Sequence, residues 1–146
     1  KVLNKDISFP PDIGIIIEKP ELLPYLSGLE NLKLLAEIRN IISYDDIKHY
    51  MDKFGLNFNS KQIVKKYSLG MKQKLGIIQA IMEDPSLLLL DEPFNALDAE
   101  SVDILRSILL QYKEQGKLII LTSHHQEDIM SVCNQVIHLQ DGCILN

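Results

Sequence analysis

The stretch Leu87-Leu88-Leu89-Leu90-Asp91-Glu92-Pro93 decides the fold of this chain. Four apolar residues followed directly by two carboxylates predict a strand that is buried on both faces and ends in acids. Open α/β sheets bind their ligands at the carboxyl ends of their strands. We therefore expect the strand to hold Asp91 and Glu92 at fixed points beside a ligand site.

Strand-like and helix-like segments alternate on both sides of this stretch. Apolar runs and turn residues predict further strands at 14–17, 117–122, 136–139 and 143–145, of which the first two are expected to be buried. Apolar residues at helical spacing predict helices from Ser27 to about Arg39, from Asp45 to Gly55, from Ser68 to Asp84, from Asp98 to Gly116 and from Gln126 to about Val132. This alternation favours the α/β class with a mainly parallel sheet, interrupted by a helical insert.

Composition limits the functions that this chain can have. The 146 residues are 46% hydrophobic and 24% charged, which is typical of one globular domain. The net charge of −5 argues against nucleic acid as a partner, because phosphate backbones attract clustered Lys and Arg. Cys133 and Cys143 have neither a metal-binding spacing nor a disulfide pattern, which favours the cytosol. The longest apolar runs are too short to cross a bilayer.

Four polar residues follow predicted strands and should gather at one edge of the sheet, namely Glu18, Asp91, Glu92 and His124. Asp91 is suited to Mg²⁺, and a neighbouring carboxylate can align and deprotonate a water molecule. His124 could bond a phosphate oxygen or the same water. Each residue also has a structural alternative: Asp91 and Glu92 could cap the turn at Pro93, Glu18 could be a solvated turn residue, and His124 a loop histidine.

The start of the predicted helix at Ser68 is a second candidate site. Ser68 is a candidate N-cap, and the free N–H groups and positive dipole end of a helix start attract anions. Gly70 would leave the backbone uncrowded there. An ordinary capped helix is the structural alternative.

These motifs, in this order, resemble the ATP-binding subunit or domain of ABC transporters over essentially the whole chain. The stretch 87–93 is similar to the Walker B strand, which implies Asp91 as a Mg²⁺ ligand and Glu92 as the general base. Asn95-Ala96-Leu97-Asp98 resembles the D-loop, which implies a contact of Asp98 across a dimer interface. Ser123-His124 resembles the switch histidine, which implies that His124 contacts the γ-phosphate of ATP.

The segment Tyr67 to Leu75 resembles a divergent signature motif, usually Leu-Ser-Gly-Gly-Gln. Ser68 and Gly70 match this pattern, whereas Tyr67, Leu69 and Met71 depart from it. In the family the motif binds the nucleotide of the other subunit. The resemblance therefore implies a head-to-tail dimer with a second ATPase subunit and two ATP molecules between them.

Glu18 stands where the family has the Q-loop glutamine, and a glutamate there resembles exporters of bacteriocin or lantibiotic type. A carboxylate in place of an amide favours a metal role. Residues of about 27–84 would be the family's helical subdomain, whose groove receives a coupling helix of a transmembrane permease subunit. The resemblance thus implies a cytoplasmic ATPase on the inner face of the cell membrane that powers transport, in the direction of export.

The sequence departs from the family in one decisive way, because it contains no Gly-x-x-x-x-Gly-Lys-Ser/Thr. Residues 1–146 are therefore expected to be the C-terminal portion of the domain, inactive alone because the cradle for the β- and γ-phosphates is missing. The missing strands should also leave apolar surface exposed. Two alternatives stay open: a non-transport ATPase of the same superfamily, and a regulatory or interaction module without catalysis.

Overall fold

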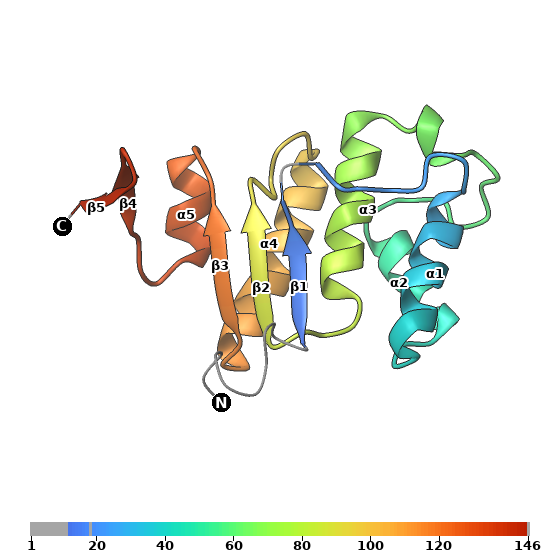
Figure 1. The fold of residues 1–146 in the computed structure, drawn as a ribbon, viewed down its shortest axis with the longest axis horizontal. Helices are drawn as coiled ribbons and strands as arrows, with labels where there is room; N and C mark the ends of the chain where they lie inside the picture. The colour runs from blue at the N-terminus through green and yellow to red at the C-terminus, as the bar shows by residue number, and fades with distance from the viewer. Residues whose placement is uncertain (1–11, 18, 146) are drawn as a thin grey trace.

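A three-stranded parallel sheet forms the centre of the protein (Figure 1). The computed structural model describes residues 12–17 and 19–145. The strands are β1 (Ile13–Ile16), β2 (Leu87–Asp91) and β3 (Leu118–Thr122), which lie side by side in the order β1-β2-β3. All three run in the same direction, so their carboxyl ends meet at one edge. The prediction of an α/β fold with a parallel sheet is confirmed.

The helices connect these strands in the predicted order. Helices α1 (Gly28–Arg39), α2 (Tyr44–Lys53) and α3 (Leu69–Ile81) come between β1 and β2, with a short 3₁₀ turn, η1 (Val64–Lys66), before α3. Helix α4 (Ala99–Glu114) connects β2 to β3, and α5 (Gln126–Val132) follows β3. Strands β4 (His138–Gln140) and β5 (Cys143–Leu145) form a separate antiparallel hairpin. Figure 1 shows α1 and α2 beside α3, on the side away from the hairpin.

Capping residues explain where the helices begin. Ser27 accepts the Glu30 N–H at 3.3 Å, while the Glu30 carboxylate accepts the Ser27 N–H at 2.7 Å. This is a reciprocal capping box, and it explains why the helix begins after Ser27. Ser68 and Asp98 cap α3 and α4 in the same manner, each accepting an N–H of the first turn. The predicted N-cap at Ser68 is confirmed, and so are the helix starts predicted at Ser27 and Asp98.

The two faces of the sheet differ in burial. Residues paired in register across parallel strands share a face, so Gly14, Ile16, Leu88 and Leu90 point to one side. This covered face packs against helices, and Leu88 is 0% exposed. The opposite, open face carries Ile13, Ile15, Leu87, Leu89, Leu118 and Ile120. Its β3 residues Leu118 and Ile120 are 60% and 54% exposed.

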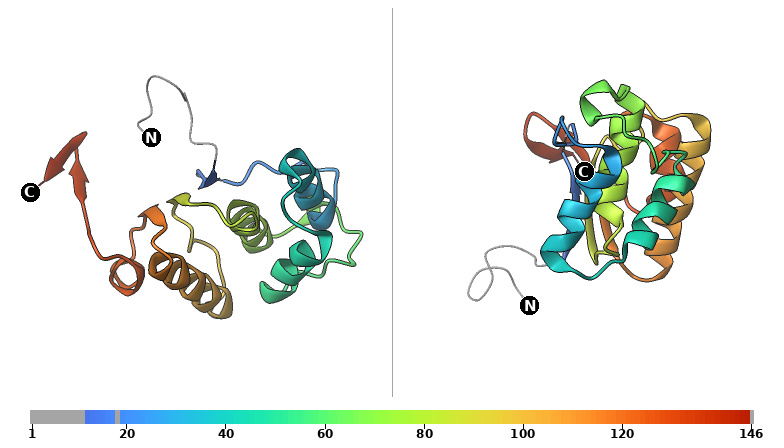
Figure 2. Two further views of the ribbon diagram at one scale, coloured as in Figure 1. Left: turned by 90° about the horizontal axis from the view of Figure 1, so that it is seen from below. Right: turned by 90° about the vertical axis from the view of Figure 1, so that its right-hand side faces the viewer.

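The prediction that the strand at 87–90 is buried on both faces is wrong for this structure, and so is the prediction of a buried strand at 117–122. Burial alternates along β2 and β3, and in each strand the more exposed residues lie on the open face. The reason is the placement of the helices, since α3, α4 and α5 all lie on one side of the sheet in the part of the chain that the structure describes (Figure 2). The apolar composition of the strands does not reveal this asymmetry.

Helix α3 lies close against β1. A Cβ added at Gly14 would stand 1.9 Å from the Ala80 carbonyl oxygen, so only glycine allows this approach of helix and strand. Helix α4 is tied to α3 through Tyr112, whose hydroxyl donates to the Ile81 carbonyl at 3.0 Å. Burial is the main cause that raises the pKa of Tyr112. The sheet and the helices behind it therefore share one core.

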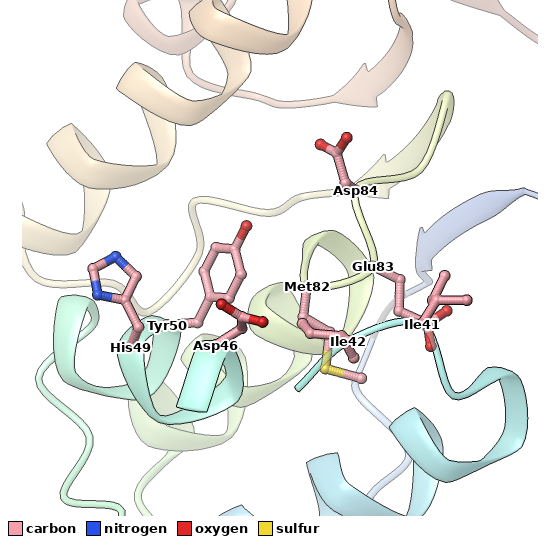
Figure 3. A pocket seen from close by; sticks show the side chains of 8 residues that line it. All are labelled: Ile41, Ile42, Asp46, His49, Tyr50, Met82, Glu83 and Asp84. Carbon is pink, nitrogen blue, oxygen red and sulfur yellow. The ribbon is translucent and has the colours of Figure 1, made fainter. Parts of the chain in front are cut away.

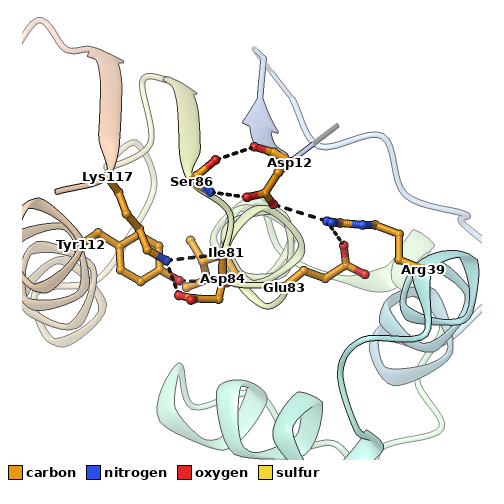
Figure 4. Close-up of polar contacts among 8 residues, drawn as sticks. All are labelled: Asp12, Arg39, Ile81, Glu83, Asp84, Ser86, Tyr112 and Lys117. Carbon is orange, nitrogen blue, oxygen red and sulfur yellow. Dashed lines mark hydrogen bonds and ion pairs between the residues drawn. The ribbon is translucent and has the colours of Figure 1, made fainter. Parts of the chain in front are cut away.

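Polar contacts fasten the helical insert to the amino ends of the strands (Figure 4). The Arg39 guanidinium, in the last turn of α1, lies 3.0 Å from the Glu83 carboxylate and 3.6 Å from that of Asp12. Asp12 in turn accepts the Ser86 N–H at 3.0 Å, just before β2. These contacts lie at the edge opposite to Asp91. None of the helices within residues 12–17 and 19–145 has the length and apolar content needed to cross a membrane.

Candidate functional site

Asp91, Glu92 and His124 meet at the carboxyl edge of the sheet, as the sequence predicts. Asp91 is the last residue of β2, and Glu92 follows it directly. His124 comes two residues after β3, and its Nδ1 lies 2.9 Å from Glu92 Oε2. The His124 side chain is 60% exposed and that of Glu92 is 32% exposed. An acid and an imidazole in contact, both open to solvent, can hold and transfer a proton at this edge.

Thr122 joins the two acids, and the sequence prediction missed it. Its hydroxyl accepts the Glu92 N–H at 3.1 Å and donates to the Asp91 carboxylate. Strand register explains the contact, because Thr122 is the partner of Asp91 across β2 and β3. The sequence held a signal for Thr122, because it ends the predicted strand at 117–122. Aligning that end with the end of the strand at 87–90 places Thr122 beside Asp91.

The backbone of Glu92 adopts an unusual conformation. Its φ angle of 48° lies in the left-handed region that residues with a side chain rarely occupy. Gln73 of α3, only 5% exposed, approaches the same turn, and its Nε2 donates to the carbonyls of Pro93 at 3.2 Å and Glu92 at 3.4 Å. Helix α3 is thereby tied to the turn that carries the acid. A polar residue among the otherwise apolar buried positions of α3 was the available signal.

Ser68 stands at the exposed start of α3. Its Oγ accepts the Met71 N–H at 3.1 Å, and the neighbouring Leu69 is 62% exposed. A capped helix start with its backbone open to solvent is suited to an anion. Gly70 has an explanation within the chain, since a Cβ there would lie 2.6 Å from the Ala96 carbonyl oxygen. Its lack of a side chain therefore allows the 95–98 loop to pack against α3.

Asp98 is engaged by two partners within the chain. Its carboxylate accepts the Ser101 N–H at 2.9 Å, which caps α4, and it pairs with the Lys74 ammonium at 2.6 Å. Hydrogen bonds from Lys74 and then Ser101 hold the pKa of Asp98 well below its usual range. Its side chain is still 58% exposed. The contact across a dimer interface stays a prediction.

The fit of the site to Mg²⁺ follows from its oxygen donors. Glu18, the other predicted metal ligand, lies outside the described residues. Among the residues that are described, no group of three or more His, Cys, Asp or Glu side chains could hold a metal ion by itself. Mg²⁺ is commonly bound through one or two carboxylates together with phosphate oxygens and water. Asp91 fits that pattern.

One hollow of the surface lies elsewhere. A pocket of about 280 Å³ opens between α2 and the end of α3, and Figure 3 shows the side chains that line it. Its acids have structural partners: Glu83 pairs with Arg39, Asp84 pairs with Lys117, and Asp46 accepts the Ser43 N–H. It lies at the amino edge of the sheet, away from Asp91. We therefore assign the chemistry to the carboxyl edge, where the acids and the histidine meet.

The fold and the carboxyl edge together define an α/β domain whose parallel sheet carries acids and a histidine at the strand ends, where such domains bind their ligands. Comparison with known families identifies it more closely. The model of the ABC transporter family matches residues 3–95, and the chain belongs to this family.

Relatives of known name agree with this assignment. The chain is 51% identical over 141 residues to the uncharacterised ABC transporter ATP-binding protein YybJ of Bacillus subtilis, covering 96% of this chain and 64% of that protein. It is 37% identical to the bacitracin transport ATP-binding protein BcrA of Enterococcus faecalis, covering 89% of this chain and 42% of BcrA. It is 36% identical to the lantibiotic transport ATP-binding protein SrtF of Streptococcus pyogenes, covering 91% of this chain and 58% of SrtF. The chain thus spans less than two thirds of these relatives.

Solved structures show the same fold. The structure of an ATP-binding subunit of an ABC transporter superimposes with a TM-score of 0.80 at 27% identity, covering 90% of this chain and 56% of that one. The cassette MJ0796, in a dimeric post-hydrolysis state with ADP and Pi, gives a TM-score of 0.76 at 23% identity and covers 92% of this chain and 61% of that one. The prediction of an ABC ATPase fold is confirmed.

Proposed function

We propose that this chain is the part of an ABC transporter ATP-binding subunit that carries the helical subdomain, at about 27–84, and the hydrolytic acids. In the complete subunit, ATP hydrolysis powers transport across a membrane. The observation that carries this proposal is the contact of 2.9 Å between His124 Nδ1 and Glu92 Oε2, beside Asp91 at the carboxyl edge of the sheet.

Each residue of this edge has a chemical role in the proposal. Glu92 accepts the proton of the attacking water, and His124 keeps the Glu92 carboxylate oriented and donates to a phosphate oxygen. Asp91 provides a carboxylate oxygen for Mg²⁺. When bound, ATP supplies the phosphoanhydride bond that is cleaved, and Mg²⁺ neutralises its charge.

Ser68, Gly70 and Asp98 belong to a second half of the proposed site. The exposed N–H groups at the start of α3 would bind the phosphates of the nucleotide held by a second subunit, arranged head to tail. Asp98 would contact that subunit at the D-loop. The dimeric state of the neighbour MJ0796 supports this arrangement.

The proposal requires a phosphate-binding loop that the 146 residues do not contain. The named relatives are longer than this chain, which supports a loop elsewhere in the complete subunit. Without the lysine and backbone amides of such a loop, the β- and γ-phosphates lack their main cradle. We accordingly expect the 146 residues alone not to hydrolyse ATP appreciably.

The proposed partner is a transmembrane permease, which would hold the ATPase at the cytoplasmic face of the cell membrane. We assign the direction as export, on the resemblance of Glu18 to the variant found in exporters and on the transport proteins for bacitracin and lantibiotics among the relatives.

Replacement of Glu92 by Gln in the complete subunit, assembled with its permease, tests this function. We expect Mg²⁺-dependent phosphate release to fall by roughly 10²–10⁴-fold, because the general base is removed, while ATP still binds. Glu100→Gln makes the same chemical change at an exposed position of α4 and serves as the matched control. The proposal would be contradicted if Glu92→Gln hydrolysed ATP at the wild-type rate. It would also be contradicted if the 146 residues alone hydrolysed ATP and Glu92→Gln abolished that activity.

A further inference from the structure

The resemblance to the ABC family gives Thr122 no role, yet its hydroxyl contacts both acids of the site. A hydroxyl has one hydrogen to donate and lone pairs that accept. In this structure the hydrogen goes to Asp91 Oδ1, and a lone pair receives the Glu92 N–H at 3.1 Å. Thr122 therefore uses both kinds of bond on two successive residues of the neighbouring strand.

We propose that Thr122 is a positioning residue for hydrolysis, which fixes the carboxylate of Asp91 and the peptide of Glu92 through one hydroxyl group. This inference rests on the proposed function, since it concerns the same acids. Thr122 itself does not react with the nucleotide.

The conformation of Glu92 explains why its peptide needs a partner. A φ of 48° is costly for a residue with a Cβ, because the side chain crowds the backbone in the left-handed region. The Thr122 hydroxyl holds the N–H of this residue, while Gln73 holds its carbonyl side at 3.4 Å. Fixing the peptide on both sides directs the Glu92 carboxylate to His124, 2.9 Å away.

The contact with Asp91 acts on the metal side of the site. A hydrogen bond to one carboxylate oxygen fixes the plane of the carboxylate and so the direction in which it offers its lone pairs. Partners of this kind orient metal ligands, and their loss typically costs about 10–100-fold in metal affinity or activity. A single threonine would thus align a metal ligand and a general base together.

Packing does not account for Thr122. Its side chain lies on the open face and is exposed, whereas the strand residues on the covered face carry the core. Valine has nearly the same shape and suits a strand equally well. Thr122→Val therefore removes the hydroxyl and leaves the fold intact, and Thr122→Ser keeps the hydroxyl and removes only a methyl group.

The experiment compares these two variants in the complete ATP-binding subunit with its permease. For Thr122→Val we expect kcat to fall about 10–100-fold, the KM for ATP to change by less than about threefold, and the Mg²⁺ concentration at half-maximal rate to rise. Thr122→Ser should restore kcat to within about threefold of the wild type. Without nucleotide or metal, hydrogen exchange of the Glu92 amide should be faster in Thr122→Val than in the wild type or Thr122→Ser.

The outcomes separate this inference from the proposed function. Wild-type kcat and unchanged Glu92 exchange in Thr122→Val would overturn the role of Thr122, as would equal loss in both variants, which would point to shape and not to the hydroxyl. Absence of Mg²⁺-dependent hydrolysis by the wild type would overturn the proposed function instead. In that case the exchange rate of the Glu92 amide would still decide whether Thr122 holds the turn.

Discussion

The covered and open faces of the sheet are built from alternating residues of the same strands, but they have different environments. On the covered face Leu88 is 0% exposed, while on the open face Leu118 is 60% exposed. Both faces are apolar, so composition cannot distinguish them. The difference shows that an apolar strand sequence indicates two faces that favour burial. Helices α3 to α5 bury one of these faces only.

The largest expected effect comes from shortening one side chain on each face. Leu88→Ala should lower the free energy of unfolding by about 2–5 kcal/mol, because it opens a cavity in the packed core. Leu118→Ala makes the same change on the open face and should cost less than about 1 kcal/mol. Denaturant unfolding of both variants gives the comparison. Equal losses would mean that the open face is packed in solution.

The open face should also cause self-association of the 146-residue chain. Ile120, 54% exposed, lies on this face in the middle of β3. Ile120→Lys should weaken association by at least roughly tenfold, since it removes an apolar contact and adds charge. Gln111→Lys adds the same side chain at an exposed position of α4 and is the control. Sedimentation velocity measures the association, and a monodisperse monomer at high concentration would contradict this prediction.

A smaller effect is expected behind the covered face, where the Tyr112 hydroxyl donates to the Ile81 carbonyl. Tyr112→Phe should cost about 0.5–1.5 kcal/mol, the net value of one hydrogen bond, because Ile81 still accepts the Asp84 N–H. Tyr25→Phe, at a residue that is 75% exposed, should cost nothing measurable.

The raised pKa of Tyr112 adds a pH dependence to this comparison. Burial keeps the folded phenol neutral, whereas the unfolded phenol ionises near pH 10. Above that pH the folded state binds more protons than the unfolded state, so stability falls as the pH rises. The fall should be smaller in Tyr112→Phe. Unfolding measured between pH 8 and 11 tests this explanation. If it is wrong, the free energy of unfolding will fall in parallel in the wild type and in Tyr112→Phe.

An effect of similar size is expected at Asp98, outside both faces. Asp98→Ala should cost about 0.5–2 kcal/mol through loss of the α4 cap, and Asp98→Asn should cost less because an amide oxygen still caps Ser101. The pKa of Asp98 is lowered, so its stabilising contribution is present above the ordinary pKa of about 3.9 and is lost as the pH falls through the folded value. Asp98→Asn should lack this dependence in acid unfolding curves.

Local sequence was sufficient to predict most of the elements. Ser27, Ser68 and Asp98 mark helix starts because a side-chain oxygen followed by a free N–H is a short-range interaction. The strands at 87–91 and 118–122 were recognisable from their apolar runs. Their burial was not, because it depends on which face the helices cover, and that is decided by residues far apart in the chain.

The residues of the site also divide into those that local sequence predicts and those that depend on contacts between distant segments. Asp91, Glu92 and His124 were predicted as neighbours because each follows a strand of a parallel sheet. Thr122 and Gln73 were missed because each acts through a contact with a distant segment. Thr122 bonds to the neighbouring strand end, and Gln73 bonds from a helix to a turn. A sequence pattern names residue types at positions, whereas a hydrogen bond depends on the register of separate elements. Glu18 remains a prediction outside the described residues.

The close packing of α3 against β1 has a mechanical consequence. Gly14 lets the Ala80 carbonyl approach the strand so closely that no methyl group fits between them, and Gly76 leaves room in the same way for Pro20. The helix is thus packed against β1 near its C-terminal end and against Pro20 near its middle. Pro20 lies just after β1, so a displacement of the chain there would press on α3 at Gly76, about 12 Å along the helix from Ser68.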